Sequence, residues 1–432
     1  MSYLKASTND LKAELEGLRR QYVRYASDII RLDMTRGKPG ADQLDLSEKM
    51  LGVIRGNDDC FAENGLDCRN YGLLDGIPEA KALFADVMGV RPEQLILGGN
   101  SSLNMMFDTF CRAFCFGNLD SERPWSKEEK VKFLCPAPGY DRHFSICQQF
   151  NIQMIPVPML EDGPDMDMIE NLVEQDAAIK GIWCVPKYSN PTGTVYSDDV
   201  VRRFANLKPK AVDFRIFWDN AYAVHDLYDE HPEILNILDE CEKAGNPNMV
   251  YMFSSTSKIT YPGSGVALIA SSVANIEHMK KQMGVQTIGP DKLNQLRHVR
   301  MFKNKEMLLE QMKKHAAVLR PKFETVLNIL ERDLGGKEIA SWSKPLGGYF
   351  ISVNAMPGCA KRIYHLCDEA GVSLTMVGAT YPYGNDPEDS NIRIAPSYPP
   401  VSELEIAMER FTVCVRIASI EKILADREAS AC

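Results

Sequence analysis

A single lysine, Lys258, follows an apolar run and lies among small hydroxylated residues and glycines, in the stretch SSTSKITYPGSG (254–265). Most lysines are exposed and fully solvated. At the mouth of a sheet, among small side chains, the amine would be partly removed from water. Its pKa would then fall, and the neutral amine could form a Schiff base with a carbonyl compound. We therefore expect the reactive group of this chain at Lys258.

Other polar residues follow predicted strands at the point where each strand ends. Ligands bind outside the carboxyl ends of the strands in an open α/β sheet. Five such ends supply glycines, small hydroxyls, an acid, an amide, tyrosines and the lysine. These segments are 98–102 (GGNSS), 136–140 (PAPGY), 187–193 (KYSNPTG), 219–222 (DNAY) and 254–258 (SSTSK). We expect them to meet in one site.

Two of these segments indicate the kind of ligand. GGNSS precedes a helical stretch, where free backbone N–H groups and the helix dipole favour a phosphate, although an ordinary serine-capped turn is the alternative. Asp219 ends an apolar strand, and a buried carboxylate needs a positive or hydrogen-bonding partner; capping the next loop is its alternative role. Together with Lys258, these groups fit an aromatic phosphate aldehyde with a basic ring nitrogen.

The elements that must position these residues follow from hydrophobic periodicity. Between about residues 90 and 272, short apolar runs alternate with helical stretches, which predicts βαβ units and a largely parallel sheet. The predicted strands are 95–97, 131–134, 152–157, 181–185, 215–218, 249–253 and 266–270. A helical pattern over 303–330 predicts a bridge between two domains, which Pro321 should kink or break.

Composition excludes several classes of protein. The chain has 432 residues and a net charge of −10, which argues against nucleic-acid binding. It has no apolar run of bilayer length and no signal-peptide core at its N-terminus. The 12 cysteines are scattered without a CxxC pair, and no histidine pattern is typical of a metal site. We expect a cytoplasmic protein with no metal and no membrane or nucleic-acid partner.

The ordered set GGNSS, Tyr140, SNPTG, DNAY, SxSK and NIRIA (391–395) resembles the fold-type I aminotransferases, which use pyridoxal 5′-phosphate (PLP). The resemblance covers nearly the whole chain, including TRGKP (35–39) and YGLLDGIPEAKALFA (71–85). Within that family, TRGKPG, SKITYPGSGVA and TIGPDKLNQLRH look most similar to the bacterial type Ic aspartate aminotransferases. The resemblance implies an α/β fold. A large PLP-binding domain (56–305) would have a mostly parallel seven-stranded sheet flanked by helices. A smaller α+β domain would combine 1–55 with 306–432.

The resemblance also implies roles around the cofactor ring. Lys258 would bind PLP covalently and shuttle a proton between the substrate Cα and the cofactor. Asp219 would pair with the ring nitrogen and keep it protonated. Asn190 and Tyr222 would hydrogen-bond the phenolic oxygen, and Tyr140 would stack on the ring face.

The phosphate is expected to be bound mainly by hydroxyl groups. The matching residues are Ser101, Ser102, Ser255, Ser257 and, from the partner subunit of a symmetric homodimer, Tyr71. Most relatives carry an arginine eight residues after the lysine, but this chain has Val266 there. Backbone amides of 263–265 or the side chain of Arg36 would have to compensate.

For the substrate, the resemblance implies that Arg393 clamps the α-carboxylate with two parallel hydrogen bonds, near Asn190 and Gly37. A distal carboxylate needs a second cation, for which Arg36, Lys38 and Lys292 are the expected residues; each could equally be a solvated surface charge.

The subgroup predicts transfer of the amino group of L-aspartate to 2-oxoglutarate, giving oxaloacetate and L-glutamate. One alternative is an aminotransferase for alanine, aromatic or other amino acids, or a lyase of the same fold. Another is a PLP-binding regulatory protein. A nucleotide-binding oxidoreductase would need a GxGxxG motif, which GGNSSL does not match.

Overall fold

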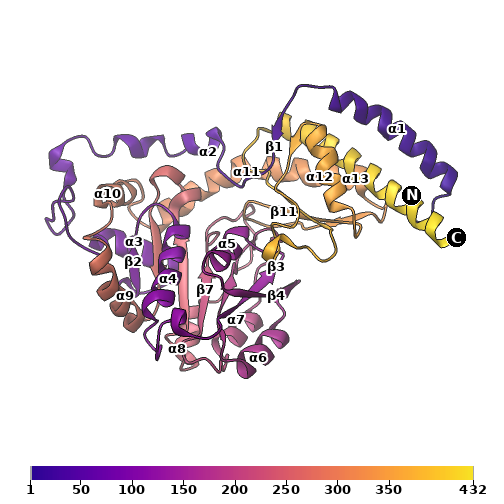
Figure 1. Ribbon diagram of the computed structural model, residues 1–432. Coiled ribbons are helices and arrows are strands. Elements are labelled where there is room, and N and C mark those ends of the chain that lie inside the picture. The colour runs from indigo at the N-terminus through magenta and orange to yellow at the C-terminus, as the bar shows by residue number, and fades with distance from the viewer. Residues whose placement is uncertain (1, 432) are drawn as a thin grey trace.

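The computed structural model describes residues 2–431, which form two lobes of unequal size (Figure 1). The larger lobe contains an eight-stranded sheet, and the smaller lobe contains a three-stranded sheet. The long helix α11 (Lys305–Leu334) runs from one lobe to the other, and both chain ends lie on the smaller lobe. None of the helices in this part of the chain has the length and apolar content needed to cross a membrane.

The large sheet has the strand order β2-β9-β8-β7-β6-β3-β4-β5. Pairs among β3, β4, β6, β7 and β8 are parallel, whereas β9 and the short β5 pair antiparallel with their neighbours. The strands are β2 (Leu95–Leu97), β3 (Lys132–Ala137), β4 (Gln153–Leu160), β5 (Gly163–Pro164), β6 (Ile179–Cys184), β7 (Arg215–Asp219), β8 (Val250–Ser255) and β9 (Ala267–Ala270). The mostly parallel α/β sheet is confirmed, and all seven predicted strands are present. The eighth strand, β5, is too short to leave a hydrophobic pattern.

The strands are mainly apolar because helices cover both faces of the sheet. Successive side chains of a strand point to opposite faces. In β7, for example, Ile216 and Trp218 enter one core cluster and Phe217 enters another. The helices of this lobe are α3 (Pro78–Met88), α4 (Ser102–Phe116), α5 (Asp141–Gln149), α6 (Met166–Gln175), α7 (Asp198–Ala205), α8 (Ile237–Lys243), α9 (Val273–Gln286) and α10 (Lys292–Met301).

The smaller lobe is built from both ends of the chain around a third core cluster. Leu11, Leu15 and Leu18 bury one face of the first helix, and the side chain of Ser7 caps its N-terminus. The elements of this lobe are α1 (Thr8–Ala26), β1 (Leu32–Asp33), β10 (Ala340–Trp342), β11 (Ile351–Ala355), α12 (Ala360–Glu369), β12 (Val372–Ser373), β13 (Asn391–Ile394) and α13 (Val401–Ala431). The short helix α2 (Ala41–Asp45) lies in the segment that leads back to the larger lobe.

Of the kink or break expected at Pro321, the break is wrong, because helix α11 continues through this residue. Leu308 and Met312 pack in the core of the larger lobe, and Leu319 packs in the core of the smaller one. The burial of apolar side chains at both ends of the helix stabilises it by more than the loss of one backbone hydrogen bond at the proline destabilises it.

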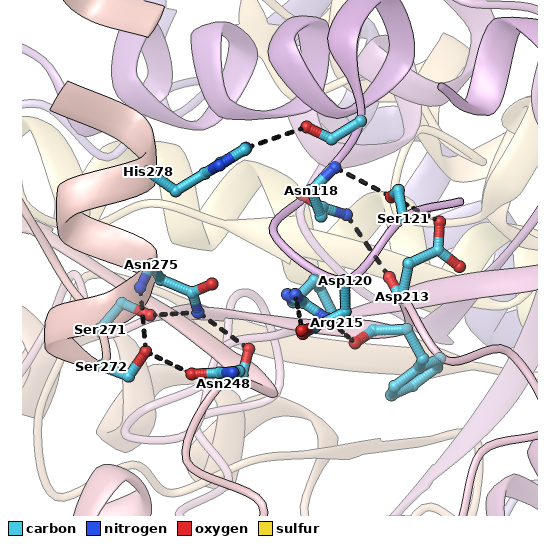
Figure 2. A network of polar contacts seen from close by, with 12 residues as sticks. Asn118, Asp120, Ser121, Asp213, Arg215, Asn248, Ser271, Ser272, Asn275 and His278 are labelled. Atoms are coloured by element: carbon cyan, nitrogen blue, oxygen red, sulfur yellow. Dashed lines mark hydrogen bonds and ion pairs between the residues drawn. The ribbon is translucent and has the colours of Figure 1, made fainter. Parts of the chain in front are cut away.

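A polar network ties together the loops at the amino ends of the central strands (Figure 2). Arg215 begins β7 and pairs with Asp120 at 2.8 Å, while Ser121 donates to Asp213 at 2.9 Å. These contacts fix the loops at the amino ends of the central strands. The predicted site lies at the opposite, carboxyl ends of the same strands.

Candidate active site

A cavity of about 820 Å³ lies at the carboxyl ends of the strands and is lined by residues of both lobes. Most of the residues expected in the site reach it. These are Arg36, Gly37, Ser101, Ser102, Tyr140, Asn190, Asp219, Tyr222, Ser255, Ser257, Lys258 and Arg393. Segments more than 350 residues apart in the sequence thus meet in one cavity.

Lys258 ends a short 3₁₀ turn that directly follows β8. Its Nζ lies 4.9 Å from the centre of the Tyr222 ring and 5.5 Å from that of Tyr349. Burial lowers the pKa of Lys258, and the negative charge of Asp219 opposes part of that shift. A larger fraction of this amine is therefore neutral and nucleophilic than in an exposed lysine.

The Lys258 turn is fixed from behind by a buried histidine of α10. His298 Nδ1 lies 2.7 Å from the carbonyl oxygen of Asn294, to which it donates, so Nε2 is left as an acceptor. That nitrogen lies 2.9 Å from the Thr256 hydroxyl and 3.0 Å from the Thr260 hydroxyl. Burial lowers the pKa of His298 to about 4, which keeps the ring neutral at pH 7.

Asp219 ends β7 and is 3% exposed. Its Oδ2 lies 3.1 Å from His143 Nε2, and the His143 ring stacks on Trp183 with the centroids 4.4 Å apart. The other oxygen, Oδ1, is buried without a hydrogen-bond partner among residues 2–431. A buried carboxylate oxygen is costly to leave unpaired, so the site is built for a ligand that donates an N–H or carries a positive charge.

Arg393, on β13, has its guanidinium fixed by contacts from three directions. Its Nη1 donates to Asp141 at 3.0 Å and to the amide oxygen of Asn190 at 3.2 Å. Its Nη2 donates to Thr375 at 3.2 Å, and the guanidinium carbon lies 4.8 Å from the centre of the Phe350 ring. Such a preoriented planar fork suits a carboxylate.

Tyr222 is buried at 3% exposure beside the lysine. Burial and then the nearby Tyr140 and Asp219 raise its pKa well above the ordinary value. Its hydroxyl therefore keeps its proton and can donate a hydrogen bond to a ligand oxygen.

Serine hydroxyls gather where α4 begins. Ser101 is the N-cap residue of α4, and the Ser257 hydroxyl donates to the carbonyl of Asn100 at 3.1 Å. Val266 is 1% exposed, and its N–H donates to the Thr256 hydroxyl at 2.9 Å, away from the cavity. The backbone of 263–265 does not line the cavity either, whereas Arg36 does.

Tyr71 and Lys292 do not line the cavity. Tyr71 is 78% exposed, and Lys292 is 4% exposed with its Nζ donating to the carbonyl of Gly72 at 2.9 Å. The structure therefore does not place Lys292 where a second cation for this chain's own cavity would be needed. Its ammonium instead holds the residue that follows Tyr71.

Sequence reasoning missed several residues around the cavity. Asp141 and Arg142 line it from the first turn of α5, in which His143 lies behind them against Asp219, and Thr375 and Phe350 line it from the smaller lobe. A signal for the first three existed, because three consecutive polar residues follow a strand-end loop, PAPGY, at the start of a helix. Thr375 and Phe350 lie in no recognisable motif.

Comparison with known proteins agrees with this geometry. The family model described as aspartate amino-transferase matches residues 4–427. An aspartate aminotransferase of Corynebacterium glutamicum is 48% identical over 420 residues, covering 96% of this chain and 97% of that protein. The crystal structure of an aspartate transaminase from Corynebacterium glutamicum superposes with a TM-score of 0.95 at 47% identity, covering 98% and 99% of the two chains.

A more distant structure shares the fold alone. The α-aminoadipate aminotransferase LysN of Thermus thermophilus has a TM-score of 0.72 at 18% identity, covering 98% of this chain and 96% of that one. The architecture is thus retained where most side chains differ. On the evidence of the family match, which spans both lobes, and of the full-length relatives, the chain belongs to the aspartate aminotransferase family.

Proposed function

We propose that the protein is a PLP-dependent aminotransferase that transfers the amino group of L-aspartate to 2-oxoglutarate, giving oxaloacetate and L-glutamate. The observation that carries the proposal is the juxtaposition of Lys258, the unpaired oxygen of buried Asp219 and the fixed guanidinium of Arg393 in one cavity. The substrate is supported by the Corynebacterium glutamicum relative, which is named an aspartate aminotransferase.

The residues present fit PLP. The amine of Lys258 would bind the aldehyde carbon, and the unpaired Asp219 Oδ1 would accept from the protonated ring nitrogen. Tyr222 would donate to the phenolic oxygen. The phosphate would be bound by the hydroxyls at the start of α4 and after β8, namely Ser101, Ser102, Ser255 and Ser257. When bound, the cofactor supplies an electron sink for the bond that breaks at the substrate Cα.

The chain's own groups then orient the substrate and move the proton. Arg393 would bind the α-carboxylate through two parallel hydrogen bonds, with Asp141 and Thr375 fixing its plane. Lys258 Nζ would take the proton from the substrate Cα, which requires a neutral amine; burial favours that form. Closure of the smaller lobe would bring Arg393 and Arg36 over the substrate and exclude water.

We also propose that the active unit is a symmetric homodimer in the cytoplasm. A tyrosine that is 78% exposed, Tyr71, on a loop fixed by Lys292 is suited to reach the phosphate of the partner's site. All cysteines among the described residues are free, which fits a reducing compartment.

The visible absorption spectrum of the purified protein tests the proposal. We expect a band from the bound cofactor that shifts on addition of L-aspartate and returns on addition of 2-oxoglutarate. A band that ignores L-aspartate but responds to alanine or an aromatic amino acid would instead support the alternative aminotransferase. Folded protein that shows no band after incubation with PLP would contradict the role of Lys258.

A further inference from the structure

We propose that His225 is a positioning residue for the reactive lysine. One nitrogen of its imidazole donates a hydrogen bond to the carbonyl oxygen of Lys258, and the other accepts from a single water molecule in a small cavity behind the active site. The inference rests on the proposed function, because it gives His225 a task in the proton transfer assigned there to Lys258.

His225 is a buried polar residue that the proposed reaction does not otherwise use. It is 3% exposed, and neither of its ring nitrogens has a hydrogen-bond partner among residues 2–431. A neutral imidazole has one donor and one acceptor, and burying both of them without partners is costly. The ring therefore calls for two hydrogen bonds from groups that lie close to it.

The His225 ring lies against the aromatic residues that surround the lysine amine. Its centroid is 5.6 Å from that of Tyr222 and 5.9 Å from that of Tyr349, with interplanar angles of 90° and 72°. The Lys258 ammonium lies over the same two tyrosine rings. A change at His225 therefore bears on the position of this amine.

The carbonyl of Lys258 is the acceptor that fits the donor of the ring. No backbone N–H group among the described residues donates to that carbonyl. Burial and then nearby positive charges, the largest that of Lys258, hold the pKa of His225 well below its ordinary value, whereas the backbone of Lys258 acts in the opposite direction. An adjacent carbonyl acts in this way, because it favours the protonated ring. The ring is therefore neutral and lies beside this carbonyl.

The next residue along the chain, Ile259, has the same kind of contact. His315 of α11 places Nε2 2.9 Å from the Ile259 carbonyl oxygen, and burial lowers the pKa of this ring as well. Two buried histidines thus face two successive carbonyls, His315 from α11 and His225 from the segment after β7. Together with His298 of α10, they hold the turn that carries Lys258.

A cavity of about 10 Å³ provides the partner for the second ring nitrogen. One buried water molecule requires roughly 10–15 Å³ and at least two polar partners. His225 and Ser254 both line the cavity, and Ser254 is 7% exposed. A water between the ring nitrogen and the serine hydroxyl would satisfy both groups. Ala221 and Ser255 line this cavity and the active-site cavity, so the water lies directly behind the site.

The two hydrogen bonds of His225 fix the backbone from which the lysine side chain extends. Proton transfer requires reacting atoms about 3–3.5 Å apart, and a misplacement of about 1 Å can cost about 100-fold in rate. The neutral ring adds no charge beside the amine, so Lys258 keeps the neutral form that burial favours. His225 does not line the active-site cavity, so its loss should slow the reaction without weakening substrate binding.

Four variants test the assignment. His225→Phe keeps the shape of the ring and removes both nitrogens. His225→Asn and His225→Gln place an amide near the position of Nδ1 and of Nε2, respectively. His278→Phe is the matched control, because the Nε2 of His278 also lies 3.5 Å from a backbone carbonyl, that of Gly117, but on α9 and outside both cavities.

The readouts are kcat and KM for L-aspartate, the urea midpoint of the cofactor-free protein, and a crystal structure of the wild type. We expect His225→Phe to lower kcat by about 30-fold and to change KM by less than about threefold. Its urea midpoint should fall, because the phenyl ring leaves the carbonyl and the water without a partner. One of the two amides should restore kcat to within about threefold of the wild type, and His278→Phe should keep the wild-type kcat. The crystal structure should show a water between His225 and Ser254.

Four results would overturn the assignment. An unchanged or higher urea midpoint in His225→Phe would mean that the ring nitrogens make no hydrogen bonds in the protein. A kcat within about threefold of the wild type would exclude an effect on Lys258, and failure of both amides to restore kcat would leave His225 with a packing role alone. A crystal structure without the water would remove the second partner. Failure of the proposed function would look different: wild-type protein would not react with L-aspartate, while the urea midpoints and the water would still decide the hydrogen bonds of His225.

Discussion

Asp219 and Lys258 line the same cavity from two strand ends, and their environments suit them to opposite tasks. Asp219 is buried with one oxygen committed to His143 and the other unpaired. It would therefore stabilise a positive charge on the ligand. Lys258 is pushed toward its neutral form by burial. In the proposed reaction, the acid would hold a proton on the ligand while the amine would be free to take one.

We predict that Asp219→Asn lowers the rate of the half-reaction with L-aspartate by roughly 100- to 1,000-fold, because a neutral amide cannot hold a proton on the ring nitrogen. Single-turnover absorbance measurements on the cofactor-loaded variant test this. The cofactor band should persist, since Lys258 is unchanged. A rate within about threefold of the wild type would contradict the role given to Asp219.

The pH dependence of Lys258 gives a second prediction at the residue scale. Its pKa lies below the ordinary value of 10.5, so the rate at which cofactor-free protein captures PLP should rise with pH and level off before pH 10.5. In Asp219→Asn, the charge that opposes the shift is gone, and the plateau should begin at still lower pH. A plateau that stays in place or moves upward in the variant would contradict the coupling between the two groups.

Residues in an ordered motif could be predicted from the sequence, and those outside one could not. Lys258, Asp219 and Arg393 stand at strand ends within recognisable segments, and the cavity contains all three. Thr375 could not be identified from its type, because it lies in no recognisable motif. Its place in the site follows from its hydrogen bond with Arg393, which only the folded chain displays.

At the scale of elements, the turn that carries Lys258 is held by a helix, α10, that does not line the cavity. α10 presents His298 to two threonines of the Lys258 turn, whose hydroxyls share the one acceptor site of the neutral ring. We predict that His298→Phe, which removes this acceptor, lowers the free energy of unfolding by about 1–3 kcal/mol. Urea unfolding at pH 7 tests this.

The lowered pKa of His298 also predicts that the protein loses stability in acid. Its folded-state pKa of about 4 lies below the ordinary value of 6.5, so the unfolded chain binds the proton more readily. The contribution, roughly 3 kcal/mol, is fully present above pH 6.5 and is lost as the pH falls from 6.5 toward 4. Urea unfolding of the wild type and His298→Phe at pH 7 and pH 5 should show a smaller acid loss in the variant. An equal loss in both proteins would exclude His298 as a source.

The elements themselves were predictable to the extent that burial leaves a periodic pattern. Six of the seven predicted strands are buried along most of their length and read as apolar runs, and β4 is buried only in part but is still rich in apolar residues, so the sequence reveals all seven. The two-residue β5 has no such pattern. The continuity of α11 through Pro321 depends on packing against two cores that are far apart in sequence. The helix propensity of the residues around a proline cannot predict such packing.

At the scale of the whole molecule, the cavity is shared between lobes, and the proposed dimer would share it between chains. Gly37, from the smaller lobe, lies against Phe350, so closely that an added Cβ would be 2.4 Å from the ring. The same ring lies under the Arg393 guanidinium. Movement of the smaller lobe would therefore carry the α-carboxylate site with it, which couples substrate binding to closure.

The contribution of the partner subunit gives the last prediction. Tyr71 is 78% exposed and lies outside its own chain's cavity. If it completes the partner's phosphate site, Tyr71→Ala and Lys258→Ala should each impair the homodimer, yet a mixed dimer of the two should contain one intact site. That site would combine Lys258 of the Tyr71→Ala chain with the tyrosine of the other chain.

With equal co-expression, half of the dimers are mixed and each has one intact site of two, so activity should recover to about a quarter of the wild-type value. Separately tagged chains allow the mixed dimer to be purified and assayed, and light scattering reports its mass. In the matched control dimer, both chains carry Lys258→Ala and one of them also carries Tyr71→Ala. This dimer should stay inactive. Activity no higher than the average of the two parent variants would mean that Tyr71 acts within its own chain or not at all, and the shared site would have to be abandoned.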